Sequence, residues 1–134
     1  MISTFTALFD ANVLFGTRLR SLILELAKTG LFRARWSEDI HAEWMAAVVE
    51  KRPDLSIADL KPTRRAMDAA VPDCLVSGYE QLIPALELPD INDRHVLAAA
   101  IVGKASVIVT FNRNDFPPTA VDRYGIHIKH PDER

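Results

Sequence analysis

The apolar positions of this chain fall either in short unbroken runs or in stripes that recur every three or four residues. Residues 5–9 form one such run, which ends at Asp10, and residues 106–110 form a second, β-branched run. Unbroken runs of this length are typical of parallel strands buried on both faces. Between residues 13 and 27 the apolar positions have helical spacing, which predicts a buried helix face, and Gly30 is a suitable end for that helix. The chain therefore begins as a strand followed by helical structure.

The next segments continue this alternation. Residues 31–36 alternate between apolar and polar side chains, which predicts a short strand with Arg33 and Arg35 on one side. Ser37 is a good N-cap residue and is followed by two acidic residues, so we expect a helix to begin there and to end before Pro53.

A second capped start lies at Ser56, and it predicts a helix that reaches about Val71. Pro62 falls inside this helix and should kink or split it, because proline has no N–H to donate. The remaining predicted elements are a strand at 74–76, a short helix at 79–83, a tightly packed helix at 92–103 and a final strand at 126–128. This order predicts an α/β fold, in three αβα layers around a mostly parallel central sheet.

Length and charge narrow the classes of protein. At 134 residues the chain has the size of a single domain, 1–134, which buries about two thirds of its unfolded surface. The net charge of −2 excludes a broadly basic surface, so contacts with nucleic acid would have to come from local patches. The candidate patches are Arg18 with Arg20, Arg33 with Arg35, Lys51 with Arg52, and Lys61 with Arg64 and Arg65.

Cys74 is the only cysteine, which excludes an intramolecular disulfide and any cysteine-based zinc site. Its apolar neighbours indicate a small core residue rather than a nucleophile, and this usage suits a reducing cytoplasm. The N-terminal segment has neither the basic region nor the long apolar stretch of a signal peptide, and no run of about 18 apolar residues predicts a membrane span. We therefore expect a cytoplasmic protein with no membrane partner.

Carboxylates occur in four short segments that the predicted fold could bring together. Two follow predicted strands and two lie on predicted helices. In open parallel sheets, ligands bind beyond the carboxyl ends of the strands, so these acids should face one cleft. The segments are Asp10 in ALFDANVLF, Glu43 in IHAEW, Asp90 and Asp93 in LPDINDRHVLAAA, and Asp115 in VTFNRNDF.

Each acid taken alone also has an ordinary structural explanation. Asp10 could be the N-cap of the following helix, Asp115 a turn residue, and Glu43 an exposed charge on an amphipathic helix. Asp93 could simply complement a helix dipole, and Asp90 could be a turn residue at the start of that helix. The combination is more informative than its members, because carboxylates that share a cleft repel by about 4 kcal/mol per close pair at an effective dielectric of about 20. A divalent cation removes that cost, and oxygen ligands favour Mg2+ or Mn2+.

Four pieces of the sequence, spanning residues 7–117, resemble the PIN-domain family, the metal-dependent ribonucleases that include the toxins of VapBC-type toxin–antitoxin pairs. The pieces are ALFDANVLF, SEDIHAEW, PDINDRHVLAAAI and VIVTFNRNDFP. The resemblance implies that Asp10, Glu43 and Asp93 coordinate the metal and that Asp115 is the fourth catalytic acid. It makes Asp90 and Asn112 supporting metal-site groups. Asn112 stands where many members of the family carry an acid, so the site has one charge fewer there.

The resemblance also implies an activity and partners. A Mg2+- or Mn2+-dependent endoribonuclease would hydrolyse phosphodiester bonds of an RNA substrate, as the toxin of a type II toxin–antitoxin pair. Its partners would be a cognate antitoxin and, since members of the family commonly dimerise, a second copy of the chain.

Other interpretations remain open from the sequence. A PIN-like module that binds RNA or protein without cutting would keep the same fold. A phosphatase of the haloacid-dehalogenase type needs a second acid at position 12, which is Asn12, and a receiver domain needs an acidic pair and a late lysine. His41 and His95 suggest a zinc site, but neither a cysteine cluster nor an HExxH motif accompanies them.

Overall fold

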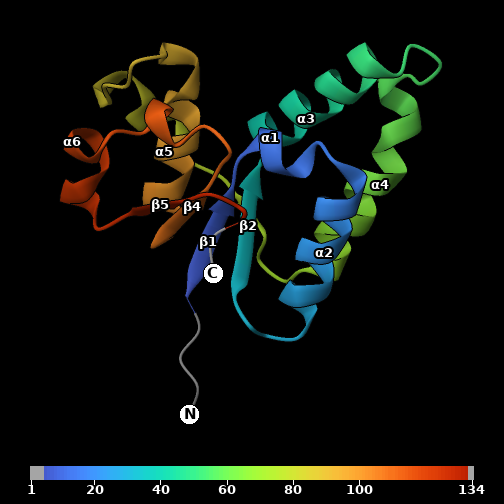
Figure 1. The fold of residues 1–134 in the computed structure, drawn as a ribbon, viewed down its shortest axis with the longest axis horizontal. Helices are drawn as coiled ribbons and strands as arrows, with labels where there is room; N and C mark the ends of the chain where they lie inside the picture. The colour runs from blue at the N-terminus through green and yellow to red at the C-terminus, as the bar shows by residue number, and fades with distance from the viewer. Residues whose placement is uncertain (1–4, 133–134) are drawn as a thin grey trace.

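A computed structural model describes residues 5–132. Five strands form one sheet in the order β3-β2-β1-β4-β5, and every paired strand is parallel to its neighbour (Figure 1). This confirms the predicted three-layer α/β fold with a parallel central sheet. The strands are β1 Thr6–Phe9, β2 Arg33–Ser37, β3 Leu75–Val76, β4 Val107–Val109 and β5 His127–Lys129.

The strand order determines which helices cover which face. From β1 to β3 the chain steps outward along the sheet, and it then returns to β4 beside β1 and steps outward in the other direction. Right-handed crossovers place the helices of these two halves on opposite faces, as Figure 1 shows for α2–α4 and for α5 with α6. The α-helices are α1 Ala11–Leu14, α2 Thr17–Lys28, α3 Glu38–Lys51, α4 Ile57–Ala70, α5 Arg94–Val102 and α6 Pro118–Val121, and the 3-10 helices are η1 Glu80–Ala85, η2 Ile91–Asp93, η3 Arg113–Asp115 and η4 Asp122–Tyr124.

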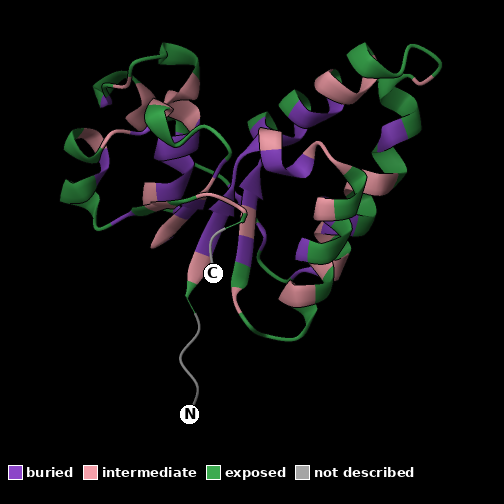
Figure 2. Cartoon of the chain, in the orientation of Figure 1, coloured by how far each residue is buried: buried purple, intermediate pink, exposed green. Residues whose placement is uncertain are grey.

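The core lies on both faces of the central strands (Figure 2). Leu8 of β1 and Ile108 of β4 are fully buried, as the unbroken apolar runs predict. The alanines of α5 are also fully buried, so this helix packs closely against the sheet. Gly103 caps α5 in a tight place, because a Cβ there would lie 2.8 Å from both the Ala99 carbonyl oxygen and Val76 Cγ2. Any larger residue would have to displace backbone at that point.

Two helical predictions differ from the structure. The stripe from residue 13 to 27 belongs to two helices, because the chain takes an extended conformation at Gly16, the N-cap of α2. Pro62 does not split α4, which runs unbroken from Ile57 to Ala70. The proline removes one backbone hydrogen bond to the Ala58 carbonyl, and because that carbonyl belongs to an exposed residue, water can replace the lost donor.

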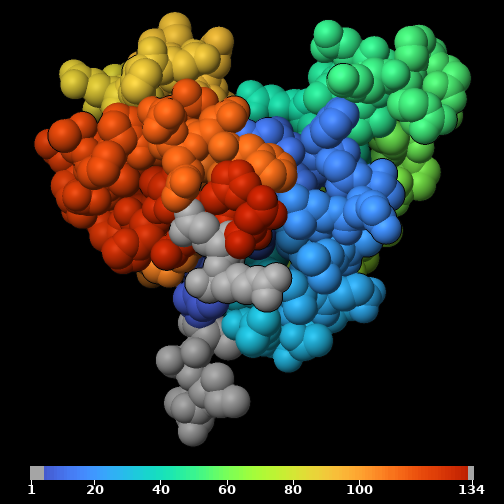
Figure 3. All heavy atoms as spheres, in the orientation of Figure 1, coloured from blue at the N-terminus to red at the C-terminus, as the bar shows by residue number. Residues whose placement is uncertain are grey.

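Among residues 5–132, no helix combines the length and the hydrophobicity that crossing a membrane requires. The segment after β5 returns toward α2, and in the space-filling view its red atoms lie against the blue atoms of the N-terminal helices (Figure 3). Pro131 lines an apolar hollow together with Leu19 and Leu22 of α2, which agrees with this placement.

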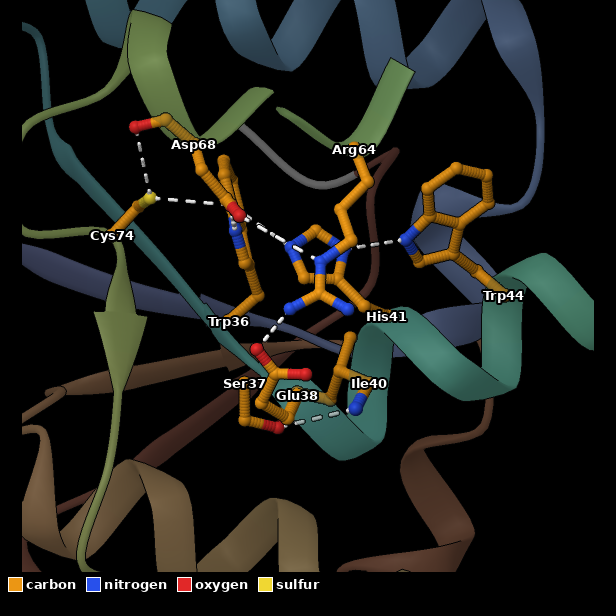
Figure 4. A network of polar contacts seen from close by, with 9 residues as sticks. All are labelled: Trp36, Ser37, Glu38, Ile40, His41, Trp44, Arg64, Asp68 and Cys74. Atoms are coloured by element: carbon orange, nitrogen blue, oxygen red, sulfur yellow. Dashed lines mark hydrogen bonds and ion pairs between the residues drawn. The ribbon is translucent and has the colours of Figure 1, made fainter. Parts of the chain in front are cut away.

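A buried polar network fastens α3 and α4 to the sheet (Figure 4). His41 of α3 donates from Nε2 to Asp68 Oδ1 of α4 at 2.9 Å, and its Nδ1 accepts from Trp44 Nε1 at 2.9 Å. Asp68 Oδ1 also accepts from the indole of Trp36 at 2.8 Å and lies 3.6 Å from the Cys74 thiol. Burial lowers the pKa of His41, which keeps the imidazole neutral and therefore able to accept from one indole while donating to the carboxylate.

Candidate metal-binding cleft

The candidate site lies where the direction of the sheet reverses, between β1 and β4. In open α/β sheets this reversal leaves a crevice beyond the carboxyl ends of the strands. Asp10 directly follows β1, and its backbone N–H donates to the Val109 carbonyl of β4 at 3.0 Å. Thr110 directly follows β4. The register of the two strands therefore brings these polar residues side by side.

Asp10 is held on both carboxylate oxygens. Oδ1 accepts from the Ala11 N–H at 2.7 Å, which makes Asp10 the N-cap of α1, and Oδ2 accepts from Thr110 Oγ1 at 3.0 Å. The residue is 7% exposed. Burial raises the pKa of Asp10 even though both hydrogen bonds act in the opposite direction. Asp10 is therefore both the N-cap of α1 and a residue of the candidate site.

Asn12 ties the loop after β1 to the loop after β4. Its Nδ2 donates to Thr110 Oγ1 at 3.1 Å and more weakly to Asp10 Oδ2 at 3.4 Å, and its Oδ1 accepts from the Phe111 N–H at 3.2 Å. The amide can make these three contacts because it carries both donors and an acceptor. A carboxylate at this position could not donate to Asp10 and Thr110.

Glu43 enters the site from α3 and contacts a histidine of α5. His95 Nε2 lies 2.9 Å from Glu43 Oε2, and the imidazole is largely buried while the carboxylate is about half exposed. Burial acts to lower the pKa of His95, but the hydrogen bond and the charge of Glu43 outweigh it, so the net shift is upward. His95 Nδ1 is buried and has no hydrogen-bond partner among the described residues.

Three of the predicted acids and Asn12 line a cleft of about 410 Å3. Burial and then the charges of the neighbouring acids raise the pKa of Asp93 to about 6. Asp90 and Asp115 do not line the cleft, yet both contribute to this shift and so lie within electrostatic reach of Asp93. The predicted site residues in the lining are Asp10, Glu43, Asp93 and Asn112.

The donor chemistry of this cleft fits a hard divalent cation. Carboxylate and amide oxygens are the ligands that Mg2+ and Mn2+ prefer, and the pKa of Asp93 is raised first by burial and then by the neighbouring acids, both of which a bound cation would offset. In the part of the chain that the structure describes, no three His, Cys, Asp or Glu side chains are already grouped as a metal site.

His41 and His95, the candidate zinc ligands, have different partners. His41 is fully buried against Asp68 and Trp44, whereas His95 contacts Glu43. A shared zinc site has no support in this arrangement.

From the sequence, Asn12 and His95 were considered only for other kinds of site and were not placed beside the acids. Asn12 lies two positions past the end of β1, a position that could have been inspected along with Asp10. His95 gave no local signal, because its partner Glu43 is 52 residues away and only the packing of α3 against α5 brings them together.

Comparison with known proteins agrees with the fold. Residues 6–114 match the model of the PIN domain family. A segment of 56 residues is 48% identical to "Putative ribonuclease VapC50" of Mycobacterium tuberculosis (strain ATCC 25618 / H37Rv), and the match spans 42% of this chain and 32% of that relative. The "Crystal structure of VapBC2 from Rickettsia felis bound to a DNA fragment from their promoter" contains a chain that superposes with a TM-score of 0.60 at 16% identity, covering 94% of this chain and 98% of that one.

Proposed function

This chain belongs to the PIN domain family, and we propose that it is a metal-dependent endoribonuclease that hydrolyses RNA phosphodiester bonds. The observation that carries the proposal is the cleft in which Asp10, Glu43 and Asp93 meet at the sheet reversal. The similarity to a putative ribonuclease over 56 residues supports the same reaction class.

Asp10, Glu43 and Asp93 would hold Mg2+ or Mn2+, with Asn112 adding a neutral oxygen. Asp115 and Asp90 would add negative charge near Asp93, which favours a cation. When bound, the cation would acidify a water and offset the charge of the phosphate oxygens.

The protein's own contribution is to hold the donor oxygens in position. The Ala11 N–H and the Thr110 hydroxyl fix both oxygens of Asp10. His95 of α5 contacts the Glu43 carboxylate and adds positive charge near the acids when it is protonated. Carboxylates that are oriented by such partners lose little freedom on binding a ligand.

We also propose that the chain acts as a toxin restrained by an antitoxin that covers the cleft, and that it forms a homodimer. The similarity to proteins named for toxin–antitoxin pairs motivates this proposal. Expression of the chain alone should arrest growth, and co-expression of the neighbouring reading frame should relieve the arrest. Growth that is unaffected by an amount of active nuclease visible in extracts would contradict the toxin role.

The nuclease proposal is tested with metal-stripped protein and a mixed single-stranded RNA. Cleavage should appear with Mn2+ or Mg2+, stop with EDTA, and be lost in Asp93→Asn. The matched control is Asp73→Asn, an exposed residue with φ of 56°, a conformation that asparagine also tolerates, and it should cut normally. RNA binding without metal-dependent cutting would instead identify a PIN-like binding module.

A further inference from the structure

The cleft is larger than a hydrated cation requires. Its volume is about 410 Å3. Six water molecules around a divalent ion would occupy roughly 180 Å3, at about 30 Å3 each. More than half of the space therefore extends beyond the acids.

That extension follows one face of α3. Glu43, Ala47 and Lys51 all line the cleft and are spaced four residues apart, so they lie on the same side of the helix. Eight residues of α-helix rise by about 12 Å, which is the distance over which the cleft leads away from its acidic end.

The walls of this extension are apolar and firmly held. Half-buried Phe15, from the turn between α1 and α2, lines it together with Ala47, while fully buried Trp44 forms its inner surface. Arg20 stacks over the Trp44 ring, 4.6 Å from its centroid, and donates to the Phe15 carbonyl at 3.3 Å. The small side chain of Ala47 leaves room beside Phe15. We call this part of the cleft the Phe15–Ala47 slot.

Two charged residues stand at the rim of the slot. Glu50 and Lys51 are both exposed and line the cleft, and neither side chain forms an ion pair or hydrogen bond with the rest of residues 5–132. An apolar slot with one cation and one anion at its rim offers stacking, a phosphate contact and an acceptor for N–H groups. Proteins bind the nucleotides of single-stranded RNA through these three kinds of contact.

We propose that the Phe15–Ala47 slot binds the nucleobase of single-stranded RNA next to the scissile phosphate; this rests on the proposed nuclease function. The base stacks on Phe15, Lys51 contacts a flanking phosphate, and Glu50 accepts a hydrogen bond from an exocyclic amine. Adenine, cytosine and guanine carry such an amine and uracil does not, so the slot favours amine-bearing bases. A base in a duplex cannot enter, because its faces are stacked and its pairing edge is occupied.

The steric test uses neighbouring alanines of α3. Ala47→Leu fills the slot, whereas Ala46→Leu makes the same change at an exposed position outside the cleft. A single-stranded RNA containing 5-iodocytidine is irradiated with each protein in EDTA, so that the RNA is not cut, and the cross-linked residue is identified by mass spectrometry. Cross-linking to Phe15 is expected in the unaltered chain and in Ala46→Leu, with at least a tenfold loss in Ala47→Leu. Unchanged Mn2+ affinity, measured from free Mn2+ by electron paramagnetic resonance, shows that Ala47→Leu leaves the acids intact.

The charged rim is tested by fluorescence anisotropy with short oligocytidylate and oligouridylate. The unaltered chain should bind oligocytidylate about fivefold more tightly or better, and Glu50→Met, which has no amide or carboxylate acceptor, should remove this preference while Glu80→Met, exposed elsewhere, retains it. Lys51→Met should reduce the slope of log affinity against log salt by about 0.7, the value for one lost phosphate contact on a single strand. Lys61→Met, exposed on α4, should not.

The slot is refuted if Ala47→Leu cross-links like Ala46→Leu, if no cross-link forms at Phe15, or if oligouridylate binds as tightly as oligocytidylate. These measurements need no cleavage, so they are independent of the nuclease assay. Cross-linking in the slot without metal-dependent cutting would reject the nuclease and keep the slot. Metal-dependent RNA cleavage that Ala47→Leu leaves unchanged would reject the slot and keep the nuclease.

Discussion

Replacing Asp93 by asparagine should stabilise the folded chain when no divalent cation is present. Asp93 lies at the N-terminus of α5 but its side chain makes no capping hydrogen bond, so the substitution removes a charge without removing a cap. Its pKa is raised from 3.8 to about 6 by burial and by the neighbouring acids. An acid with a raised folded-state pKa opposes folding once it is ionised, and asparagine imitates its neutral form.

The size of the effect follows from the shift. About two pKa units correspond to roughly 3 kcal/mol at 1.36 kcal/mol per unit. Asp93 is only partly buried, and solvent screening reduces this to about 1 kcal/mol. The unfavourable contribution is absent well below pH 3.8, where Asp93 is protonated in both states, and it grows as the pH rises from 3.8 to about 6. The stability advantage of Asp93→Asn should therefore be full at pH 8 and shrink toward pH 4.

Urea unfolding in EDTA, followed by tryptophan fluorescence from pH 4 to pH 8, measures this difference, with Asp73→Asn as the control. Added Mn2+ should reverse the order, because a ligand that binds only the folded state stabilises it and Asp93→Asn would bind the ion poorly. Equal or lower stability of Asp93→Asn at pH 8 in EDTA, with Asp73→Asn unchanged, would refute the reasoning.

Three further predictions concern other parts of the molecule. His95→Ala should lower kcat for RNA cleavage at least tenfold while His95→Gln recovers part of it, because glutamine can still donate to Glu43; equal kcat in the two variants would contradict this role. Cys74 should react with iodoacetamide at pH 8 only as fast as the chain unfolds, since burial raises the pKa of its thiol to about 12, and labelling that urea does not accelerate would contradict the assignment. Pro62→Ala should raise the free energy of unfolding by about 1–3 kcal/mol by restoring the hydrogen bond to the Ala58 carbonyl, and a loss of stability in urea would show that the proline is required.

Much of the fold could be predicted because its determinants are local. The apolar runs ending at Asp10 and Thr110 gave β1 and β4, and Ser37 and Ser56 do cap the helices they were expected to start. The break at Gly16 was missed because periodicity continues across it. The predicted split at Pro62 does not occur, because an exposed helix surface tolerates one missing donor.

The acids of the site were predictable because they follow strands or lie on helices that the α/β topology brings to one crevice. Their hydrogen-bond partners were not, because Glu43 meets His95 through helix packing. Whether these acids bind a metal and act on RNA stays a prediction until the experiments above are done.

The network around His41 has a consequence for how variants of this chain are interpreted. Asp68 lies on α4, far in sequence from every acid of the cleft, yet through His41 and Trp44 it anchors the helix that carries Glu43. A mutational screen scored only on lost RNA cleavage would rank Asp68 among the proposed catalytic acids. The effect of an Asp68 substitution would come from displacement of α3. Only a parallel measurement of soluble, folded protein would distinguish this cause from the loss of a catalytic group.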